Sequence, residues 1–334
     1  MKICIWITKI FDLGGTKRVV SLLANELVKE HEVTIMTYED RFREDRTMYH
    51  LSEDINVDFI DNSQFVNKHH TPAFCARYLV KKLNDRSGLF NKKSQNPILA
   101  EANIPKKTRE KWVEYFNSQD YDVILTTASL SLRLAMIAPR LKAATIGWQH
   151  NCYDGYLHVK PVVFWQQENL LQQYLPNLDR YIVLSDYDKR DYMEKLGIDC
   201  EVKINPRSFV SEKKCDVKSK RFLMATRFVY AKGLDLMMES FEEFCKEDSE
   251  WELDIIGDGD LFDQIRADAK KRHLEKRVHF VGYTNEPEKY YLNSSVFLLP
   301  SRWEGWPMVI MEAFEFGLPV IAYHMRAIDL NIDE

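Results

Sequence analysis

The sequence alternates between short apolar runs and longer stretches with helical spacing, and this alternation restricts the fold more than any other feature. The apolar runs of the first half have strand length and cover residues 3–7, 33–37, 55–60, 122–127, 143–147 and 180–184. Successive strands joined by helices pair in parallel with right-handed crossovers. The pattern therefore predicts an α/β fold built on parallel sheets.

A polar, charged stretch at residues 207–220 interrupts the alternation and is typical of a linker. Beyond it, strands are expected at residues 221–226, 252–256, 278–281, 295–299 and 319–323. A chain of 334 residues is long enough for two domains of ordinary size. We therefore expect two Rossmann-like, doubly wound domains, residues 1–206 and 207–334, that face each other across a cleft.

The composition is that of a soluble globular protein, with 45% hydrophobic and 29% charged residues. A net charge of −5 gives no general attraction to nucleic acid. Six cysteines without a C-x-x-C pair argue against a zinc site and a disulfide framework, and favour a reducing compartment. The apolar start at residues 3–7 is too short for a signal peptide, and no run approaches the ~20 residues of a spanning helix. We expect a cytoplasmic protein.

One segment near the end of the chain combines two carboxylates, Glu304 and Glu312, with a helix start. Pro307 suits the first helical turn, and Gly317 suits its end. Free N–H groups and the positive dipole end at such a start attract phosphate. Glu312 would lie on the helix and need a polar partner, such as sugar or ribose hydroxyls; a solvated surface glutamate is the alternative. The expected packing face of this helix comprises Ile310, Ala313, Phe314 and Gly317.

Two features of the first half lie at expected strand ends. Gly14 and Gly15 precede a helix and permit the close approach of a ligand, although a plain strand-to-helix turn is the alternative. His150 follows the strand at residues 143–147, on the side where parallel sheets bind ligands. A hydrogen-bonded structural histidine is the alternative there.

In the second half, Arg227 ends a strand and Lys232 precedes a helix, a placement suited to a diphosphate. An ordinary surface charge is the alternative. Two D-x-D triplets, at residues 186–188 and 258–260, raise the alternative of a divalent cation. Because both are expected in turns that open helices, where acids favour the dipole, we expect no metal. Motifs of serine hydrolases, P-loops and dinucleotide sites are absent.

Residues 66–111 form a basic segment in an acidic chain. They hold eleven Lys or Arg and three acids, a balance of +8. Within the segment, residues 73–83 have roughly amphipathic helical spacing. Such a helix could rest on an anionic membrane surface; a solvated helix with a basic insertion is the alternative.

Together, these motifs resemble the retaining glycosyltransferases of family 4, which have the GT-B fold. The resemblance covers nearly the whole chain and is carried by the E-x7-E signature from Glu304 to Glu312, with Gly305, Trp306 and Pro307 between them. The stretch "ATRFVYAKG" resembles the family's diphosphate-binding loop, "IIGDG" and "VHFVGY" resemble its later strands, and His150 matches the histidine of its cleft.

The resemblance implies a role for each matched residue. Glu304 would contact the donor sugar and Glu312 the ribose, while His150 would contact the transferred sugar. Arg227 and Lys232 would bind the nucleotide diphosphate. The donor-binding set it implies is Gly14, Gly15, Arg227, Lys232, Gly305, Trp306, Pro307 and Glu312, with Glu304 and His150 as catalytic residues.

The implied activity is metal-independent and needs no cofactor. A hexosyl unit would move, with retention of configuration, from a nucleotide diphosphate sugar, with uridine as the expected base, to a surface-glycan or lipid-linked acceptor. The enzyme would be cytoplasmic or peripheral on the inner face of the membrane. A catalytically silent GT-B subunit and a nucleotide-sugar epimerase are the alternatives.

The sequence also departs from the family pattern. Family members continue past a position like Glu334 with another strand and a helix that crosses back to the first domain. We therefore expect the C-terminal closing elements to be missing, either because the chain is a truncated form or because its second sheet is one strand short. Trp306 stands where smaller or other aromatic residues are common, which leaves the donor sugar open.

Overall fold

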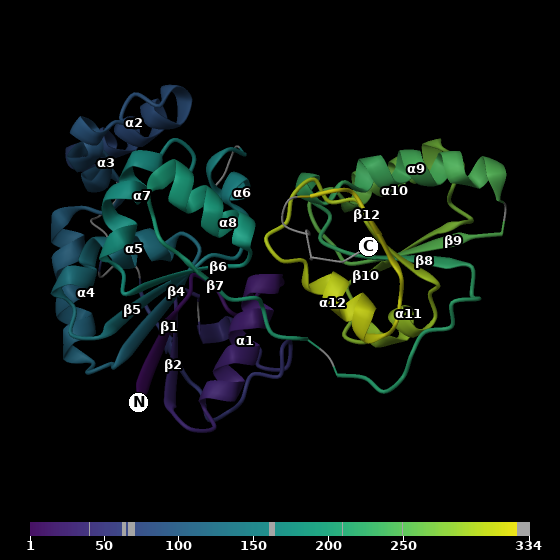
Figure 1. Ribbon diagram of the computed structural model, residues 1–334, viewed down its shortest axis with the longest axis horizontal. Helices are drawn as coiled ribbons and strands as arrows, with labels where there is room; N and C mark the ends of the chain where they lie inside the picture. Colours follow the sequence, from purple (N-terminus) through teal and green to yellow (C-terminus); the bar gives the residue numbers. More distant parts are fainter. Residues whose placement is uncertain are drawn as a thin grey trace. The chain divides into compact units, whose positions relative to one another are not determined.

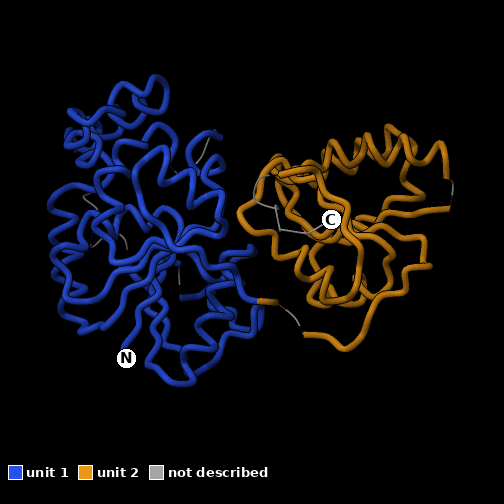
Figure 2. Tube along the Cα trace, viewed as in Figure 1, with its two compact units in different colours: residues 1–206 blue, residues 207–334 orange. Residues whose placement is uncertain are grey.

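The computed structural model describes residues 1–39, 41–61, 65, 71–159, 164–208, 210–248 and 250–325. The chain divides into two compact units, residues 1–206 and 207–334 (Figure 2). Each unit is an α/β layer structure and is described by itself. The chain end at residues 331–334, on which the expectation of missing elements rested, lies outside the described residues.

Unit 1 contains a seven-stranded sheet in which every neighbouring pair is parallel. The strand order is β3-β2-β1-β4-β5-β6-β7. The strands are β1 (Lys2–Trp6), β2 (Glu32–Thr37), β3 (Asn56–Phe59), β4 (Val123–Thr127), β5 (Ala144–Trp148), β6 (Arg180–Val183) and β7 (Glu201–Val202). This confirms the parallel arrangement predicted from the alternation.

Helices cover the sheet of unit 1 on both faces (Figure 1). They are α1 (Gly15–Leu27), α2 (Pro72–Ser87), α3 (Asn96–Asn103), α4 (Lys106–Ser118), α5 (Leu130–Ile137), α6 (Tyr153–Leu157), α7 (Glu168–Tyr174) and α8 (Asp186–Asp191). One core cluster joins Cys4 and Trp6 of β1 to side chains of α4 and α5, including Trp112 and Phe116. Helices α2 and α3 lie at the periphery of the unit (Figure 1).

Unit 2 contains a five-stranded parallel sheet with the order β10-β9-β8-β11-β12. Its strands are β8 (Arg221–Ala225), β9 (Glu252–Ile256), β10 (Val278–Gly282), β11 (Val296–Leu299) and β12 (Val320–Ala322). Its helices are α9 (Leu234–Glu247), α10 (Phe262–Lys271), α11 (Glu288–Leu292) and α12 (Met308–Glu315). Helices α9 and α10 lie on one face of the sheet, and α11 and α12 on the other (Figure 1).

The two faces of this sheet carry separate core clusters, because side chains along a strand alternate between faces. On β8, Phe222 and Met224 belong to the cluster beneath α9 and α10. Leu223 and Ala225 belong to the cluster beneath α11 and α12. A strand buried on both sides reads as a continuous apolar run, as residues 221–226 do.

In each sheet the strand order reverses direction at one point. In sheets of this kind, ligands generally bind between the loops that follow the strands at this point. In unit 1 this point lies between β1 and β4, and in unit 2 between β8 and β11. The loop after β8 carries Arg227 and Lys232, and the loop after β11 carries Glu304. The topology therefore brings the predicted residues of unit 2 to one edge of one sheet.

Helical spacing alone does not fix where a helix begins or ends. In the described residues, α7 spans Glu168–Tyr174. Helix α8 ends at Asp191 and continues as a π-helical turn, Tyr192–Leu196. The prediction that Phe314 packs inward was wrong, because its side chain is 43% exposed. Helix α12 ends at Glu315, and Phe316 and Leu318 beyond it fill the core instead.

Gly233 sets the distance between the two loops at the reversal point of unit 2. Its φ is +64°, in the left-handed region that favours glycine. A Cβ atom built on it would lie 2.0 Å from the carbonyl oxygen of Pro300, the residue that follows β11. Only glycine permits this approach, so the residue is needed both for its conformation and for lack of a side chain.

Gly233→Ala should therefore destabilise the protein more than an alanine at a glycine with the same conformation and free space. Gly282 is a matched control in the same unit, with a φ of +77° and no atom within 4 Å of a built Cβ. We expect Gly282→Ala to cost about 1–2 kcal/mol of unfolding free energy from backbone strain. Gly233→Ala should cost at least about 2 kcal/mol more in urea unfolding. Equal losses would contradict the close approach.

Candidate functional site

A mostly buried ion pair joins the two loops at the carboxyl edge of unit 2. The Lys232 ammonium lies 2.5 Å from Oε1 of Glu304, and the side chains are 21% and 10% exposed. The Ser301 hydroxyl donates a second hydrogen bond of 2.7 Å to the same oxygen. Burying a carboxylate this far is costly unless such partners satisfy it. The structure thus brings together two residues that lie 72 positions apart in the sequence.

Further contacts fix the same two loops. The Arg302 guanidinium donates to both carboxylate oxygens of Asp235, at 2.8 and 2.6 Å, and lies 4.0 Å from the ring centroid of Tyr230. The Arg302 hydrogen bond lowers the pKa of Asp235. The backbone N–H of Arg302 also donates to the carbonyl of Ala231. Because Arg302 is engaged with Asp235, it serves the loop structure and is not available as a free cation.

Arg227 is placed differently. It follows β8 and is exposed, and no hydrogen bond or ion pair of its guanidinium is found among the described residues. Its backbone carbonyl accepts the N–H of Val229, which shapes the turn before the 3-10 segment Tyr230–Lys232. Within the described part of the chain, the loop after β8 therefore offers an uncommitted guanidinium as well as a paired lysine. Such donors suit an anionic ligand.

Helix α12 begins where the sequence predicted. Pro307 is the residue before Met308, and no side chain caps the helix start. Gly305 and Pro307 are buried, and the indole N–H of the half-buried Trp306 is enclosed without a hydrogen-bond partner among the described residues. The free backbone N–H groups at such a start, together with the helix dipole, favour a negative charge.

Glu312 is 3% exposed on α12, and the Tyr291 hydroxyl of α11 donates a 2.8 Å hydrogen bond to its Oε2. Tyr291 is itself fully buried and stacks against the rings of Phe297 and Phe316. The polar partner that Glu312 was expected to need is thus supplied in part by the fold.

In unit 1, Gly14 and Gly15 lie at the start of α1, after β1. Gly14 has a φ of +151°, so its backbone favours glycine, whereas Gly15 has open space around a built Cβ. The Tyr49 hydroxyl accepts the N–H of Gly14 at 2.9 Å. Glu39, which follows β2, accepts the N–H groups of Ile10 and Phe11 through one carboxylate oxygen. Tyr49 therefore fixes the glycine turn, and Glu39 fixes the loop that precedes it.

His150 follows β5 at the carboxyl edge of the unit 1 sheet. Both of its ring nitrogens are buried and have no hydrogen-bond partner among the described residues. Its ring packs against Trp148 at a centroid distance of 4.5 Å. Burial lowers the pKa of His150 to about 3, so the imidazole is neutral at neutral pH. The alternative of a hydrogen-bonded structural histidine thus finds no support in the described contacts.

The D-x-D triplets have structural roles. Asp188 accepts the N–H of Tyr153 and the hydroxyl of Ser185, and Ser185 caps α8. Gly259 donates its N–H to Asp258 in the turn before α10. In the described part of the chain, no three His, Cys, Asp or Glu side chains lie close enough to hold a metal ion. A metal-independent reaction stays a prediction.

Sequence reasoning missed four residues that shape these sites, namely Glu39, Tyr49, Tyr291 and Ser301. Glu39 lies two residues after the apolar run at residues 33–37, so a carboxylate near a strand end was the available signal. Ser301 follows the run at residues 295–299 and could have been found in the same way. Tyr49 and Tyr291 lie in loops or short helices with no spacing signal.

Comparisons with known proteins identify the family of the chain. Residues 13–208 match the model of Glycosyltransferase Family 4, and residues 208–329 match that of Glycosyl transferases group 1. The first match alone covers more than half of the chain. The chain belongs to the GT-B glycosyltransferases. The parallel sheets of both units confirm the expected fold of two doubly wound α/β domains.

Several individual glycosyltransferases and solved structures are similar to this chain. An uncharacterized glycosyltransferase of Haemophilus influenzae is 26% identical over 97% of this chain and 80% of its own length. A lipopolysaccharide 1,6-galactosyltransferase of Salmonella typhimurium is 31% identical over 30% of this chain and 29% of its own. The structure of TarM has a TM-score of 0.72 at 15% identity, covering 98% of this chain and 85% of TarM. The structure of the lipopolysaccharide outer core galactosyltransferase WaaB has a TM-score of 0.62 at 21% identity, covering 96% of this chain and 80% of WaaB.

The neutral state of His150 gives the glycosyltransferase a measurable acid sensitivity. The folded state holds this imidazole at a pKa of about 3, below its value of about 6.5 in an unfolded chain. Well above pH 6.5 the imidazole is neutral in both states, so it costs no stability. As the pH falls through 6.5 the unfolded chain binds a proton that the folded state does not, and the unfolding free energy declines. Between pH 6.5 and 5 the wild type should lose roughly 2 kcal/mol more unfolding free energy than His150→Gln. Parallel pH profiles in urea unfolding would contradict the burial of the ring.

Proposed function

We propose that this glycosyltransferase moves a hexosyl unit from a UDP-sugar to a growing surface glycan or a lipid-linked acceptor, with retention of anomeric configuration. Similar structures support a uridine donor, since HepE and GtfA have each been solved with UDP. Partial relatives support the acceptor class. They include an amylovoran biosynthesis glycosyltransferase of Erwinia amylovora and the O-antigen biosynthesis glycosyltransferase WclY of Escherichia coli.

The observation that carries the proposal is the Lys232–Glu304 pair at the strand-order reversal of unit 2. A diphosphate carries more negative charge than one carboxylate, so it can draw the Lys232 ammonium toward itself. Glu304 keeps the Ser301 hydroxyl as a partner and gains capacity to accept hydrogen bonds from sugar hydroxyls. Lys232 would thereby bind the diphosphate of a nucleotide sugar, and Glu304 its sugar.

Stabilising the charge on the leaving group is the main electrostatic requirement of such a transfer. When the bond between the anomeric carbon and the diphosphate oxygen breaks, negative charge develops on that oxygen. Arg227, Lys232 and the start of α12 would stabilise it. The acceptor hydroxyl then bonds to the anomeric carbon on the same face, and its proton passes to the departing diphosphate. The proposed step uses neither metal nor cofactor.

Two further residues complete the proposal. Glu312, with one oxygen held by Tyr291, would accept a hydrogen bond from a ribose hydroxyl. The neutral His150 would bind the transferred sugar through a ring nitrogen, because both nitrogens lack partners among the described residues. A neutral imidazole can accept a hydrogen bond from a sugar hydroxyl at one nitrogen and donate one at the other.

Glu304→Ala and Lys232→Ala should each lower kcat/KM for sugar transfer at least about 100-fold, because each removes a group proposed to act on the donor. Lys289→Ala is a matched control, since that lysine of unit 2 forms an exposed pair with Glu286. Circular dichroism would verify folding of each variant. Unchanged turnover in both site variants would overturn the proposed site, and an inverted product anomer in NMR spectra would overturn retention.

Thermal shift separates the two roles. A ligand at 100 times its Kd stabilises the folded state by about 2.7 kcal/mol. Wild type should be stabilised more by its UDP-sugar donor than by UDP. Glu304→Ala should lose this difference but keep the response to UDP, whereas Lys232→Ala should lose most of both. A Glu304→Ala variant that still distinguishes the sugar from UDP would exclude contact between Glu304 and the sugar.

A further inference from the structure

Helix α2 exposes apolar side chains to an unusual extent. Sixteen large hydrophobic side chains are exposed among the described residues, and five of them fall between residues 78 and 98. Three are on α2 itself, where Tyr78, Leu79 and Leu83 are 58%, 55% and 38% exposed. The other two, Leu89 and Ile98, follow in the turn after α2 and on α3. This concentration marks an interaction surface rather than scattered exposure.

The apolar side chains of α2 share one face with cations. Leu79, Lys82, Leu83 and Arg86 stand at positions i, i+3, i+4 and i+7 of the helix. All four are exposed, and the Lys82 ammonium lies over the Tyr78 ring at 5.8 Å. No ion pair of Lys82 or Arg86 is found among the described residues. We call these four residues and Tyr78 the α2 face.

The opposite side of α2 is fixed to the body of unit 1 by hydrogen bonds. Asn84, the one buried residue of α2, donates to the carbonyl of Gln166 and accepts the N–H of Phe90. The carbonyl of Asp85 accepts the indole N–H of Trp165. These contacts hold the helix against residues 164–167 and leave the α2 face turned outward.

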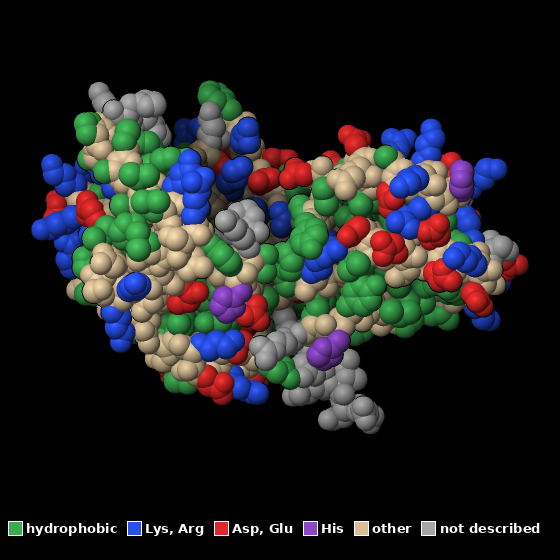
Figure 3. All heavy atoms as spheres, turned by 90° about the horizontal axis from the view of Figure 1, so that it is seen from above, with side chains coloured by type: hydrophobic (Ala, Val, Ile, Leu, Met, Phe, Trp, Pro, Cys, Tyr) green, Lys and Arg blue, Asp and Glu red, His purple; other side chains and the backbone are tan. Residues whose placement is uncertain are grey.

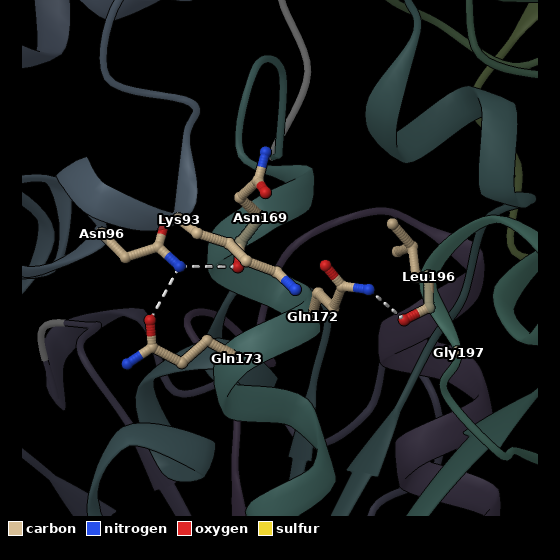
Figure 4. Close-up of a pocket in the computed structure, with 7 residues that line it drawn as sticks. All are labelled: Lys93, Asn96, Asn169, Gln172, Gln173, Leu196 and Gly197. Atoms are coloured by element: carbon tan, nitrogen blue, oxygen red, sulfur yellow. Dashed lines mark hydrogen bonds between the residues drawn. The ribbon is translucent and has the colours of Figure 1, made fainter.

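The neighbouring helix α3 is held in the same way, by side-chain amides (Figure 4). Asn96 donates to the carbonyl of Asn169 and to the side chain of Gln173, both on α7. Gln172 donates to the carbonyl of Leu196. These residues, with Lys93 and Gly197, line a pocket of about 460 Å³. The pocket therefore lies within the attachment of this helix pair to unit 1.

We propose that the α2 face binds an anionic lipid surface. Tyrosine and leucine side chains partition into the headgroup region, while lysine and arginine extend to lipid phosphates. Hydrophobic and basic side chains lie side by side on the surface seen in Figure 3, which looks down on the α2 side of unit 1. Charge complementarity favours an anionic membrane over a symmetric dimer, because a two-fold contact through this face would set Lys82 and Arg86 of one copy against the same cations of the other.

The structure narrows the basic segment first defined as residues 66–111. Lys106 pairs with Glu110, and Arg109 pairs with Glu101, so the later cations are partly neutralised. The membrane-binding part is the α2 face, within Pro72–Ser87. None of the described helices is both long and apolar enough to cross a bilayer, so the proposed contact is a surface contact.

Flotation of the full chain with vesicles tests the proposal without any donor sugar. Wild type should float with vesicles of phosphatidylglycerol and phosphatidylcholine, and not with phosphatidylcholine alone. The double variants Leu79→Glu/Leu83→Glu and Lys82→Glu/Arg86→Glu should each partition at least tenfold more weakly. All four positions are exposed, so these variants are expected to fold, and circular dichroism verifies this.

Two matched controls make the test specific to α2. Lys106→Glu/Lys107→Glu changes the net charge by the same amount on α4, and Met193→Glu places a charge at another exposed apolar position of unit 1. Both should float like wild type. The proposal is overturned if wild type fails to float, or if the α4 variant loses as much binding as the α2 variants. It is also overturned if Leu79→Glu/Leu83→Glu converts a dimer to a monomer and vesicles are never bound. Glu304→Ala should float normally, so this test is independent of the transfer reaction.

Discussion

The ion pair between Lys232 and Glu304 depends on a constraint set elsewhere, the contact of Gly233 with Pro300. A side chain at position 233 would separate the loops after β8 and β11 and leave the glutamate in a mostly buried place with the Ser301 hydroxyl as its one remaining partner among the described residues. The cost of burying an unpaired carboxylate makes the pair and the loop packing mutually dependent. The distance between the two loops of the candidate donor site thus depends on the backbone at Gly233. Lys232 and Glu304, which were identified from the sequence, supply the charged groups.

Much of this arrangement could be predicted because it depends on periodicity and strand ends. Residues 221–226 read as a strand buried on both faces, and the structure distributes Phe222 and Leu223 to opposite cores. Lys232 and Glu304 could be placed at one sheet edge because parallel strands end together. The prediction for Phe314 failed for a different reason. Helical spacing defines a face, but the part of that face that is covered depends on where the helix ends and on how the next residues pack.

Pairings between distant side chains could not be predicted. Glu312 was expected to need a polar partner, yet nothing in the sequence connects it with Tyr291, twenty-one residues earlier on another helix. Glu39 is a similar case, because an acid in a loop is ordinarily solvated, whereas this one receives two backbone N–H groups of the loop after β1. Such partners are selected by tertiary packing. A single sequence without the fold holds no record of them.

The amide contacts beneath α2 and α3 have a consequence for how the protein can change over time. Hydrogen bonds from Asn84 and Asn96 to backbone carbonyls of Gln166 and Asn169 fix the orientation of these helices from their inner side. Substitutions on the outer side then leave that attachment untouched. A lineage could therefore change the outer side, which we propose to bind lipid, while the sheet edges and their loops stay the same. The proposed donor site of unit 2 and the proposed lipid-binding face of unit 1 would then be separately adjustable within one chain.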